Sequence, residues 1–133
     1  MMKEFLELPN NISHVPALGT WIENVGEKMQ LAPDKIFNLN LAIEEAVVNV
    51  MNYAYPGKEG KVYLQAYDED GHVFVVIEDE GIPFDPLAKD DPDVTLAAED
   101  RPIGGLGIFL VKELMTDVSY EWKGGRNILK VEV

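Results

Sequence analysis

Three short segments of this sequence carry residue types that could perform chemistry together. Glu45 and Asn49 stand four positions apart, Asp79 is followed closely by Gly81, and a glycine-rich run occupies positions 104–107. A carboxylate can move a proton, an amide oxygen can ligate a hard cation, and consecutive glycine N–H groups can cradle phosphates. Together, in this order, the segments predict a purine nucleotide site with a metal-bridged triphosphate.

The first segment predicts a metal ligand and a base on one helix. Residues four apart lie on the same helical face at a separation of about 6 Å, which places Glu45 beside Asn49. We expect Asn49 to offer its carbonyl oxygen to Mg²⁺, and Glu45 to orient or deprotonate an attacking hydroxyl. Glu44 would point elsewhere. A solvated helix face would show the same residues, so this segment alone does not define a site.

The second segment predicts a contact to the base. Asp79 is the last residue of the predicted strand 73–79, and its carboxylate could accept the N6–H of adenine, whereas guanine has no donor there. Gly81 would let the backbone pass close beneath a flat ring. An ordinary turn is the competing interpretation, since Asp-Glu-Gly and Ile-Pro are good turn formers. The Phe84 that follows favours the site, because a turn needs no buried aromatic ring.

The third segment predicts a phosphate cradle. Gly104, Gly105, Leu106 and Gly107 lead directly into the amphipathic run 108–114, which is typical of a helix. Inward-turned N–H groups and the helix dipole together attract anions. The run lacks the Gly-Lys-Ser/Thr ending of a P-loop. A flexible hinge is the alternative interpretation of the same glycines.

The elements that must position these residues follow from hydrophobic periodicity. Steps of three and four predict helices, alternation predicts strands, and Gly124-Gly125 marks a turn between the last two strands. We expect Ser13 to cap the first helix. The predicted helices span 13–29, 33–53 and 107–115, with a weak one at 94–98, and the predicted strands span 3–8, 61–67, 72–78, 118–122 and 127–133. This order predicts an α+β two-layer sandwich, an open sheet covered on one face.

The length, charge and composition of the chain limit the classes of function that it can have. A length of 133 residues fits a single domain over 1–133, and a net charge of −13 argues against nucleic acid as a partner. No apolar run approaches the roughly 20 residues that span a bilayer, and the first residues do not read as a signal peptide. The chain has no cysteine. These features lead us to expect a cytoplasmic protein without a membrane partner.

The three segments resemble the motifs of the GHKL, or Bergerat-fold, ATPases. Glu45 and Asn49 match the N box of that superfamily, residues 79–83 match its G1 box, and residues 105–107 match its G2 box. Within it, the sequence is most similar to the bacterial anti-sigma factor serine/threonine kinases. The similarity to these kinases includes Ala42-Ile43-Glu44-Glu45-Ala46-Val47-Val48-Asn49 and the Phe84-Asp85-Pro86 extension.

The resemblance implies both a fold and an activity. It implies a mixed, mostly antiparallel Bergerat-type sheet with an ATP lid at about 86–103, an irregular stretch of prolines and acids. It implies that Asn49 ligates Mg²⁺, that Glu45 is the general base, and that Asp79 contacts adenine. Such kinases use ATP to phosphorylate a serine on a small anti-anti-sigma (STAS-type) protein, and they sequester a sigma factor. Many form homodimers.

Two other functions stay open from the sequence. One is a binding module that uses nucleotide to set its shape and transfers no phosphate. The other is a stand-alone histidine-kinase-type catalytic domain. His14 and His72 lack the helical context of a phosphoacceptor, so this reading requires a partner chain.

Overall fold

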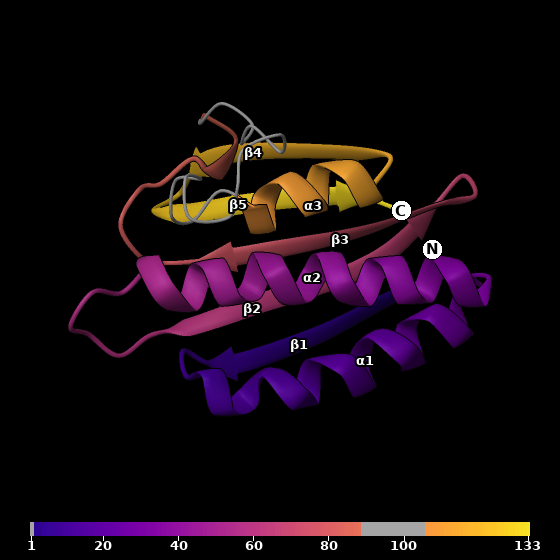
Figure 1. Ribbon diagram of the computed structural model, residues 1–133, viewed down its shortest axis with the longest axis horizontal. Coiled ribbons are helices and arrows are strands. Elements are labelled where there is room, and N and C mark those ends of the chain that lie inside the picture. Colours follow the sequence, from indigo (N-terminus) through magenta and orange to yellow (C-terminus); the bar gives the residue numbers. More distant parts are fainter. Residues whose placement is uncertain (1, 89–105) are drawn as a thin grey trace, which may run out of the picture.

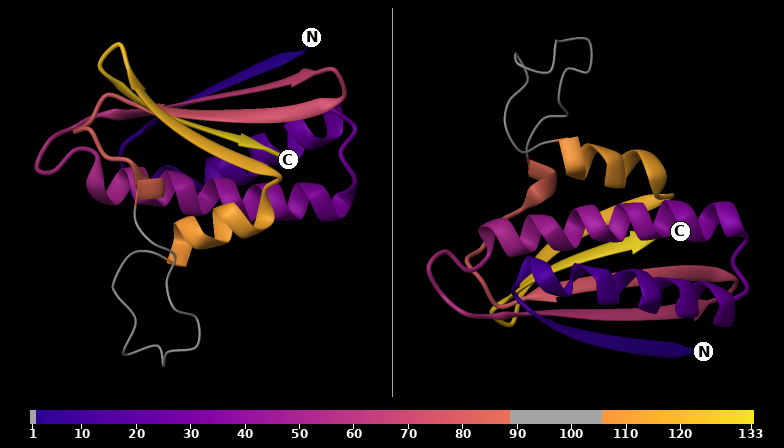
Figure 2. Two further views of the ribbon diagram at one scale, coloured as in Figure 1. Left: turned by 90° about the horizontal axis from the view of Figure 1, so that it is seen from above. Right: turned by 60° about the horizontal axis from the view of Figure 1, so that its bottom comes forward.

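The protein is described by a computed structural model over residues 2–88 and 106–133. These residues form a five-stranded sheet with three α-helices on one of its faces (Figures 1 and 2). In chain order the elements are β1 (Lys3–Pro9), a 3-10 turn (Ile12–His14), α1 (Val15–Lys28), α2 (Pro33–Tyr53), β2 (Lys61–Glu69), β3 (His72–Asp79), a 3-10 turn (Pro86–Ala88), α3 (Leu106–Leu114), β4 (Asp117–Lys123) and β5 (Arg126–Glu132). The predicted α+β sandwich is confirmed.

The strand order is β1-β2-β3-β5-β4, and every pairing is antiparallel. Two hairpins, β2–β3 and β4–β5, account for most of the sheet, and β5 is the strand that pairs with β3. This arrangement aligns the end of β3 with the start of β5, so that Asp79 is the direct partner of Asn127. Two polar residues that are 48 positions apart therefore meet on the sheet.

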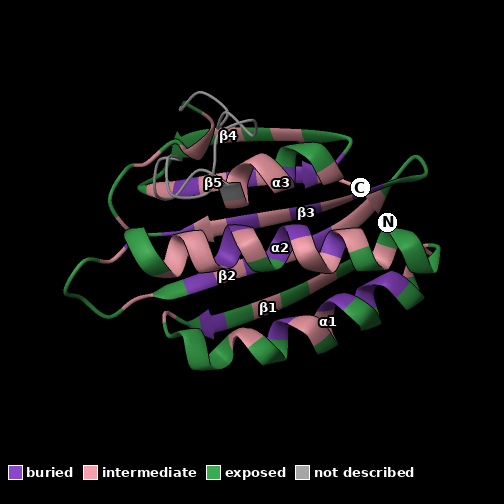
Figure 3. Cartoon of the chain, viewed as in Figure 1, coloured by how far each residue is buried: buried purple, intermediate pink, exposed green. Residues whose placement is uncertain are grey.

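The core lies between the sheet and the helices. Alternate residues of β2, β3 and β5 face the helices and are buried, as are the inner stripes of α1 and α2 (Figure 3). Helix α2 packs between α1 and α3 and contacts both (Figure 1). The predicted stripes are confirmed at their centres, with these residues buried: Leu18, Ile22, Val25, Leu39, Ile43 and Val47. This packing holds α2 rigidly against the sheet.

The start of the first helix differs from the prediction. Ser13 does not cap it; Ser13 lies inside the short 3-10 turn, and Asn11 accepts the Ser13 N–H through its side chain at 3.0 Å. The α-helix begins at Val15 instead, with Pro16 in its first turn. Asn11 caps this 3-10 turn, because its extended backbone lets the side chain reach the second N–H, whereas α1 follows His14 without a side-chain cap.

Two of the predicted features lie wholly or largely outside the described residues. The weak helix at 94–98 falls there entirely, and of the expected lid only the turn Pro86–Ala88 is described. Within the described part, no helix combines the length and the apolar character that crossing a membrane requires.

Candidate functional site

Helix α2 carries the first group of candidate residues. Glu45, Asn49 and Tyr53 follow one another at steps of four, so they form a line along one side of the helix. This line runs beside the buried stripe and is only partly covered by the rest of the fold. Glu44 is exposed and lies off this line, as expected.

The N-terminal end of α3 closes one end of that line. A small pocket is formed there by Glu45, Val48, Asn49, Asn52, Tyr53, Gly107 and Ile108. A Cβ atom on Gly107 would lie only 2.6 Å from Oε2 of Glu45. The first turn of α3 therefore lies against the Glu45 carboxylate, and a side chain at position 107 would require that carboxylate to move. The structure thus brings Glu45, Asn49 and Gly107 to one pocket.

A second, more apolar pocket adjoins the first. It lies between α2, the end of β3 and the hairpin β4–β5. Its lining is Ala46, Asn49, Val50, Tyr53, Ala54, Ile77, Asp79, Ile82, Phe84, Pro86, Tyr120, Asn127 and Leu129. Asn49 and Tyr53 line both pockets. Apolar walls with a few convergent polar groups are typical of a site for a flat organic ligand.

Asp79 is the charged group in this second pocket. The residue is only 4% exposed, and its Oδ1 accepts two hydrogen bonds, from Gly81 N at 2.9 Å and from Asn127 Nδ2 at 2.8 Å. Burial raises the pKa of the Asp79 carboxyl above its ordinary value, and these two hydrogen bonds offset part of that rise. The carboxylate is held in place and poorly solvated, which makes it a strong acceptor for a ligand donor.

The raised pKa of Asp79 gives a prediction about stability. A carboxyl whose pKa is higher in the folded state contributes stability that is fully present below its unfolded pKa and is lost as pH rises through the folded pKa. We therefore compare the free energy of unfolding of the wild type with that of Asp79→Asn. We expect this difference to fall as pH rises from the unfolded-state pKa of Asp79 through its folded-state pKa. Denaturant unfolding of both proteins at a series of pH values measures the difference, and a flat difference would contradict the assignment.

Gly81 is required for a contact that differs from the expected one. A Cβ atom here would lie 2.2 Å from the carbonyl oxygen of Ala54, at the end of α2. The next residue, Ile82, donates its N–H to that same carbonyl at 2.9 Å. The close approach is thus to the helix end, and it fixes the segment after β3 against α2.

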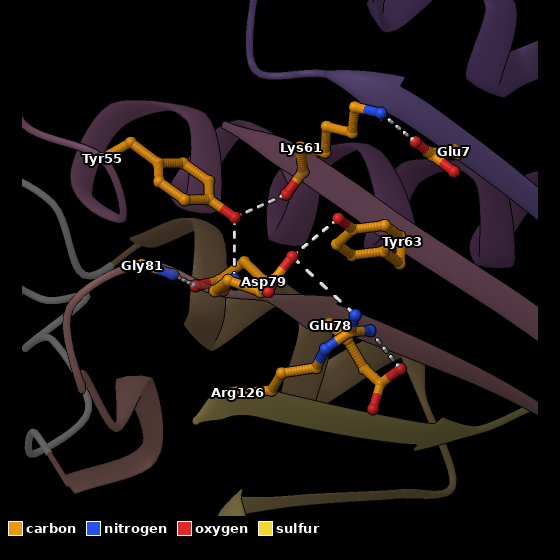
Figure 4. Close-up of polar contacts among 9 residues, drawn as sticks. Glu7, Tyr55, Lys61, Tyr63, Glu78, Asp79, Gly81 and Arg126 are labelled. Carbon is orange, nitrogen blue, oxygen red and sulfur yellow. Dashed lines mark hydrogen bonds and ion pairs between the residues drawn. The ribbon is translucent and has the colours of Figure 1, made fainter. Parts of the chain in front are cut away.

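A tyrosine clamp holds the same segment from the other side (Figure 4). The hydroxyl of Tyr55 donates to the carbonyl of Lys61 and accepts the N–H of Glu80, both at 2.7 Å. The Glu80 carboxylate accepts the hydroxyl of Tyr63 at 2.7 Å and lies 3.8 Å from Arg126. Glu80 therefore points away from the pocket toward the open face of the sheet, while Asp79 points into it.

Asn127 was not predicted as a site residue, although its place in the strand pattern gives a signal. Asn127, Leu129 and Val131 alternate along β5, and all three are buried on its core face. A polar residue in that register must find partners inside the protein. The alternation therefore predicts that Asn127 is buried. It does not predict the partners of Asn127, because they come from distant segments of the sequence.

The residues of the site could hold a cation such as Mg²⁺ only together with a bound ligand. Within residues 2–88 and 106–133, no group of three or more His, Cys, Asp or Glu side chains could hold a metal ion. Asn49 offers one neutral oxygen, so the remaining oxygens would have to come from a bound ligand and from water. Gly104 and Gly105 lie outside the described residues, and Leu106 is described only as the first residue of α3.

Comparisons with known proteins place the chain in a family. Residues 8–133 match the family described as the histidine kinase-like ATPase domain. The chain is 26% identical, over 137 aligned positions, to proteins named serine-protein kinase RsbW from Bacillus cereus strain AH820 and Bacillus thuringiensis strain Al Hakam. Each alignment covers 97% of this chain and 86% of the relative.

A solved structure shares the fold. The crystal structure of the RsbU and RsbW domains of Rv1364c from Mycobacterium tuberculosis superposes with a TM-score of 0.68 at 15% identity. The match covers 99% of this chain and 32% of the longer polypeptide. At that identity the likeness concerns the arrangement of helices and strands.

Proposed function

The chain belongs to the histidine kinase-like ATPase domain family, and from this premise we propose that it is an ATP-dependent protein serine/threonine kinase of the anti-sigma type. One observation carries the proposal: Asp79, Asn49 and Glu45 line two adjoining pockets that share Asn49 and Tyr53. This order supports an assignment of Asp79 as the adenine acceptor, Asn49 as the metal ligand and Glu45 as the base along a bound nucleotide.

In this proposal each residue has a separate role. Asp79 accepts the exocyclic amine of adenine inside the apolar pocket, where Tyr53 and Phe84 stack with ring centroids 6.1 Å apart and form a wall. Asn49 holds Mg²⁺, which would neutralise charge on the phosphates when bound. Glu45 orients the serine hydroxyl and receives its proton. The N–H groups of residues 104–107 would face the phosphates.

The partners are proposed by family likeness. The relatives are named serine-protein kinases, which supports transfer to a serine on a small STAS-type anti-anti-sigma protein. Sequestration of a sigma factor, a homodimeric state and a cytoplasmic location belong to the same proposal. So does the interpretation of 1–133 as a single ATPase domain with its lid at 86–103. The net charge of −13 is consistent with basic protein surfaces as partners rather than nucleic acid.

Nucleotide should stabilise the protein measurably. At ligand a hundredfold above Kd, linkage adds about 2.7 kcal/mol to the free energy of unfolding, which for a chain of this size raises Tm by on the order of 10 °C. Thermal melting with millimolar ATP or ADP, with and without Mg²⁺, measures this shift. The Asn49→Ala variant should lose the part that depends on magnesium. A Tm indifferent to nucleotide in the wild type would remove the basis of the proposal.

A further inference from the structure

Asn127 uses its entire hydrogen-bonding capacity inside the protein. The residue is 6% exposed, and its Nδ2 donates to Asp79 Oδ1 and to the carbonyl of Ile82, both at 2.8 Å. Its Oδ1 accepts the N–H of Phe84 at 3.0 Å and the hydroxyl of Tyr120. A primary amide has two donor hydrogens and two acceptor positions, and all four are used.

The direction of this amide is dictated by its backbone partners. A carbonyl oxygen can only accept and a backbone N–H can only donate. Turning the amide over would set its oxygen against the carbonyl of Ile82 and its NH₂ group against the N–H of Phe84. Both bonds would be lost. The Nδ2 of Asn127 is therefore fixed on the side of Asp79.

This fixed donor determines which oxygen of Asp79 faces a ligand. Oδ1 is engaged by Asn127 and by the N–H of Gly81, and no hydrogen bond within the described part of the chain ends on Oδ2. Asp79 lines the apolar pocket. Oδ2 is thus left as an acceptor for a group inside the pocket. An amino group satisfies that acceptor, whereas a carbonyl oxygen at the same place would be repelled.

We propose that Asn127 is a positioning residue that orients the Asp79 carboxylate and so makes the site selective for a purine with an amino group at position six. This inference rests on the proposed nucleotide-binding function. Asn127 acts through Asp79 and reads no part of the base itself. The same side chain also ties down the segment of Ile82 and Phe84, so one residue places the acceptor and the aromatic wall together.

A substitution that replaces the Nδ2 donor by a second carboxylate oxygen tests the proposal, because repulsion then takes the place of the bond that orients Asp79 when both groups are ionised. Asn127→Asp keeps the size of the side chain and the oxygen that serves Phe84 and Tyr120, but it replaces the Nδ2 that serves Asp79 and Ile82. ATP and ITP differ only at position six and the adjacent N1 proton, so the ratio of their affinities reports recognition of the amino group. We expect this ratio in the full-length protein to fall by about tenfold or more, measured by calorimetry.

Tyr120→Phe is the matched control. It removes the hydroxyl that donates to Asn127 Oδ1 and leaves the bond from Nδ2 to Asp79 intact. We expect it to weaken ATP and ITP by the same factor, so that the ratio stays at the wild-type value. A role of Asn127 in holding the fold alone would predict equal losses for both nucleotides in Asn127→Asp as well, and that result would overturn the proposal.

A measurement on the wild type covers the case in which Asn127→Asp does not fold. In protein labelled with ¹⁵N at asparagine, the side-chain NH₂ signal of Asn127 should exchange slowly with solvent, because both of its protons are donated internally. It should shift more on saturation with ATP than with ITP, and equal shifts would overturn the proposal. A wild type that prefers ATP while the variant keeps the same ratio refutes only this inference. A wild type that binds neither nucleotide refutes the proposed function too.

Discussion

Replacing Glu45 by alanine should slow phosphoryl transfer and leave nucleotide affinity almost unchanged. General-base catalysis contributes about 10²–10⁴-fold in rate, and the low end applies here because positioning dominates phosphoryl transfer. Glu45 lies one helical turn from Asn49 and against Gly107, in the pocket that Asp79 does not line. Its loss should therefore remove the base without disturbing the contact to adenine. Single-turnover transfer and calorimetric ATP binding measure the two effects separately.

Glu44→Ala is the matched control for that experiment. Glu44 is the neighbouring acid on α2, it is exposed, and it lines neither pocket. It should transfer phosphate at the wild-type rate. If Glu45→Ala also keeps the wild-type rate, Glu45 is a solvated helix residue and has no role as a base.

Replacing Asp79 by asparagine should reverse the preference between purines. The amide has one acceptor oxygen and brings donors that oppose the amino group of adenine but match the oxygen of inosine. Loss of a charge-assisted hydrogen bond costs about 1.5–3 kcal/mol, or roughly 10-fold to 150-fold in ATP affinity. ITP should lose far less or gain. Titration of both triphosphates into the variant measures the change.

The control for Asp79→Asn is the carboxylate beside it. Glu80→Gln removes the same charge, but the Glu80 side chain bonds to Tyr63 and approaches Arg126 rather than lining the pocket. We expect its ratio of ATP to ITP affinity to equal that of the wild type. If Asp79→Asn loses affinity for ATP and ITP by the same factor, Asp79 is a turn residue that does not contact the base.

Most of the fold could be predicted because local patterns determine it. The three-and-four spacing of Leu18, Ile22 and Val25 can bury one helix face only, and the alternation in β2 and β3 allows one inward register. The start of α1 was less predictable. Ser13 and Asn11 are both good capping residues, and only the backbone angles of the folded chain show which one reaches an N–H.

The candidate site, like the fold, could be predicted only where local patterns determine it. Glu45 and Asn49 could be paired from the sequence because a helix fixes their relative position. Asn127 and Tyr55 could not be placed, because their partners lie 48 and 25 positions away and meet them only through the pairing of β3 with β5 and the turn after α2. Gly81 was predicted to approach a ligand ring, and in the structure its close contact is instead to the end of α2. Its neighbour, the carbonyl of Ala54, belongs to another element and could not be inferred.

The proposed serine kinase activity is tested most directly by transfer of the γ-phosphate of labelled ATP to a candidate STAS-type protein. We expect label on a serine, stable to acid, at a rate that falls in Glu45→Ala and not in Glu44→Ala. Acid-labile label on a histidine would instead indicate a histidine-kinase-type catalytic domain. If the protein is saturated with Mg·ATP and labels no serine substrate, the kinase assignment is contradicted, and a nucleotide-gated binding module becomes the better description.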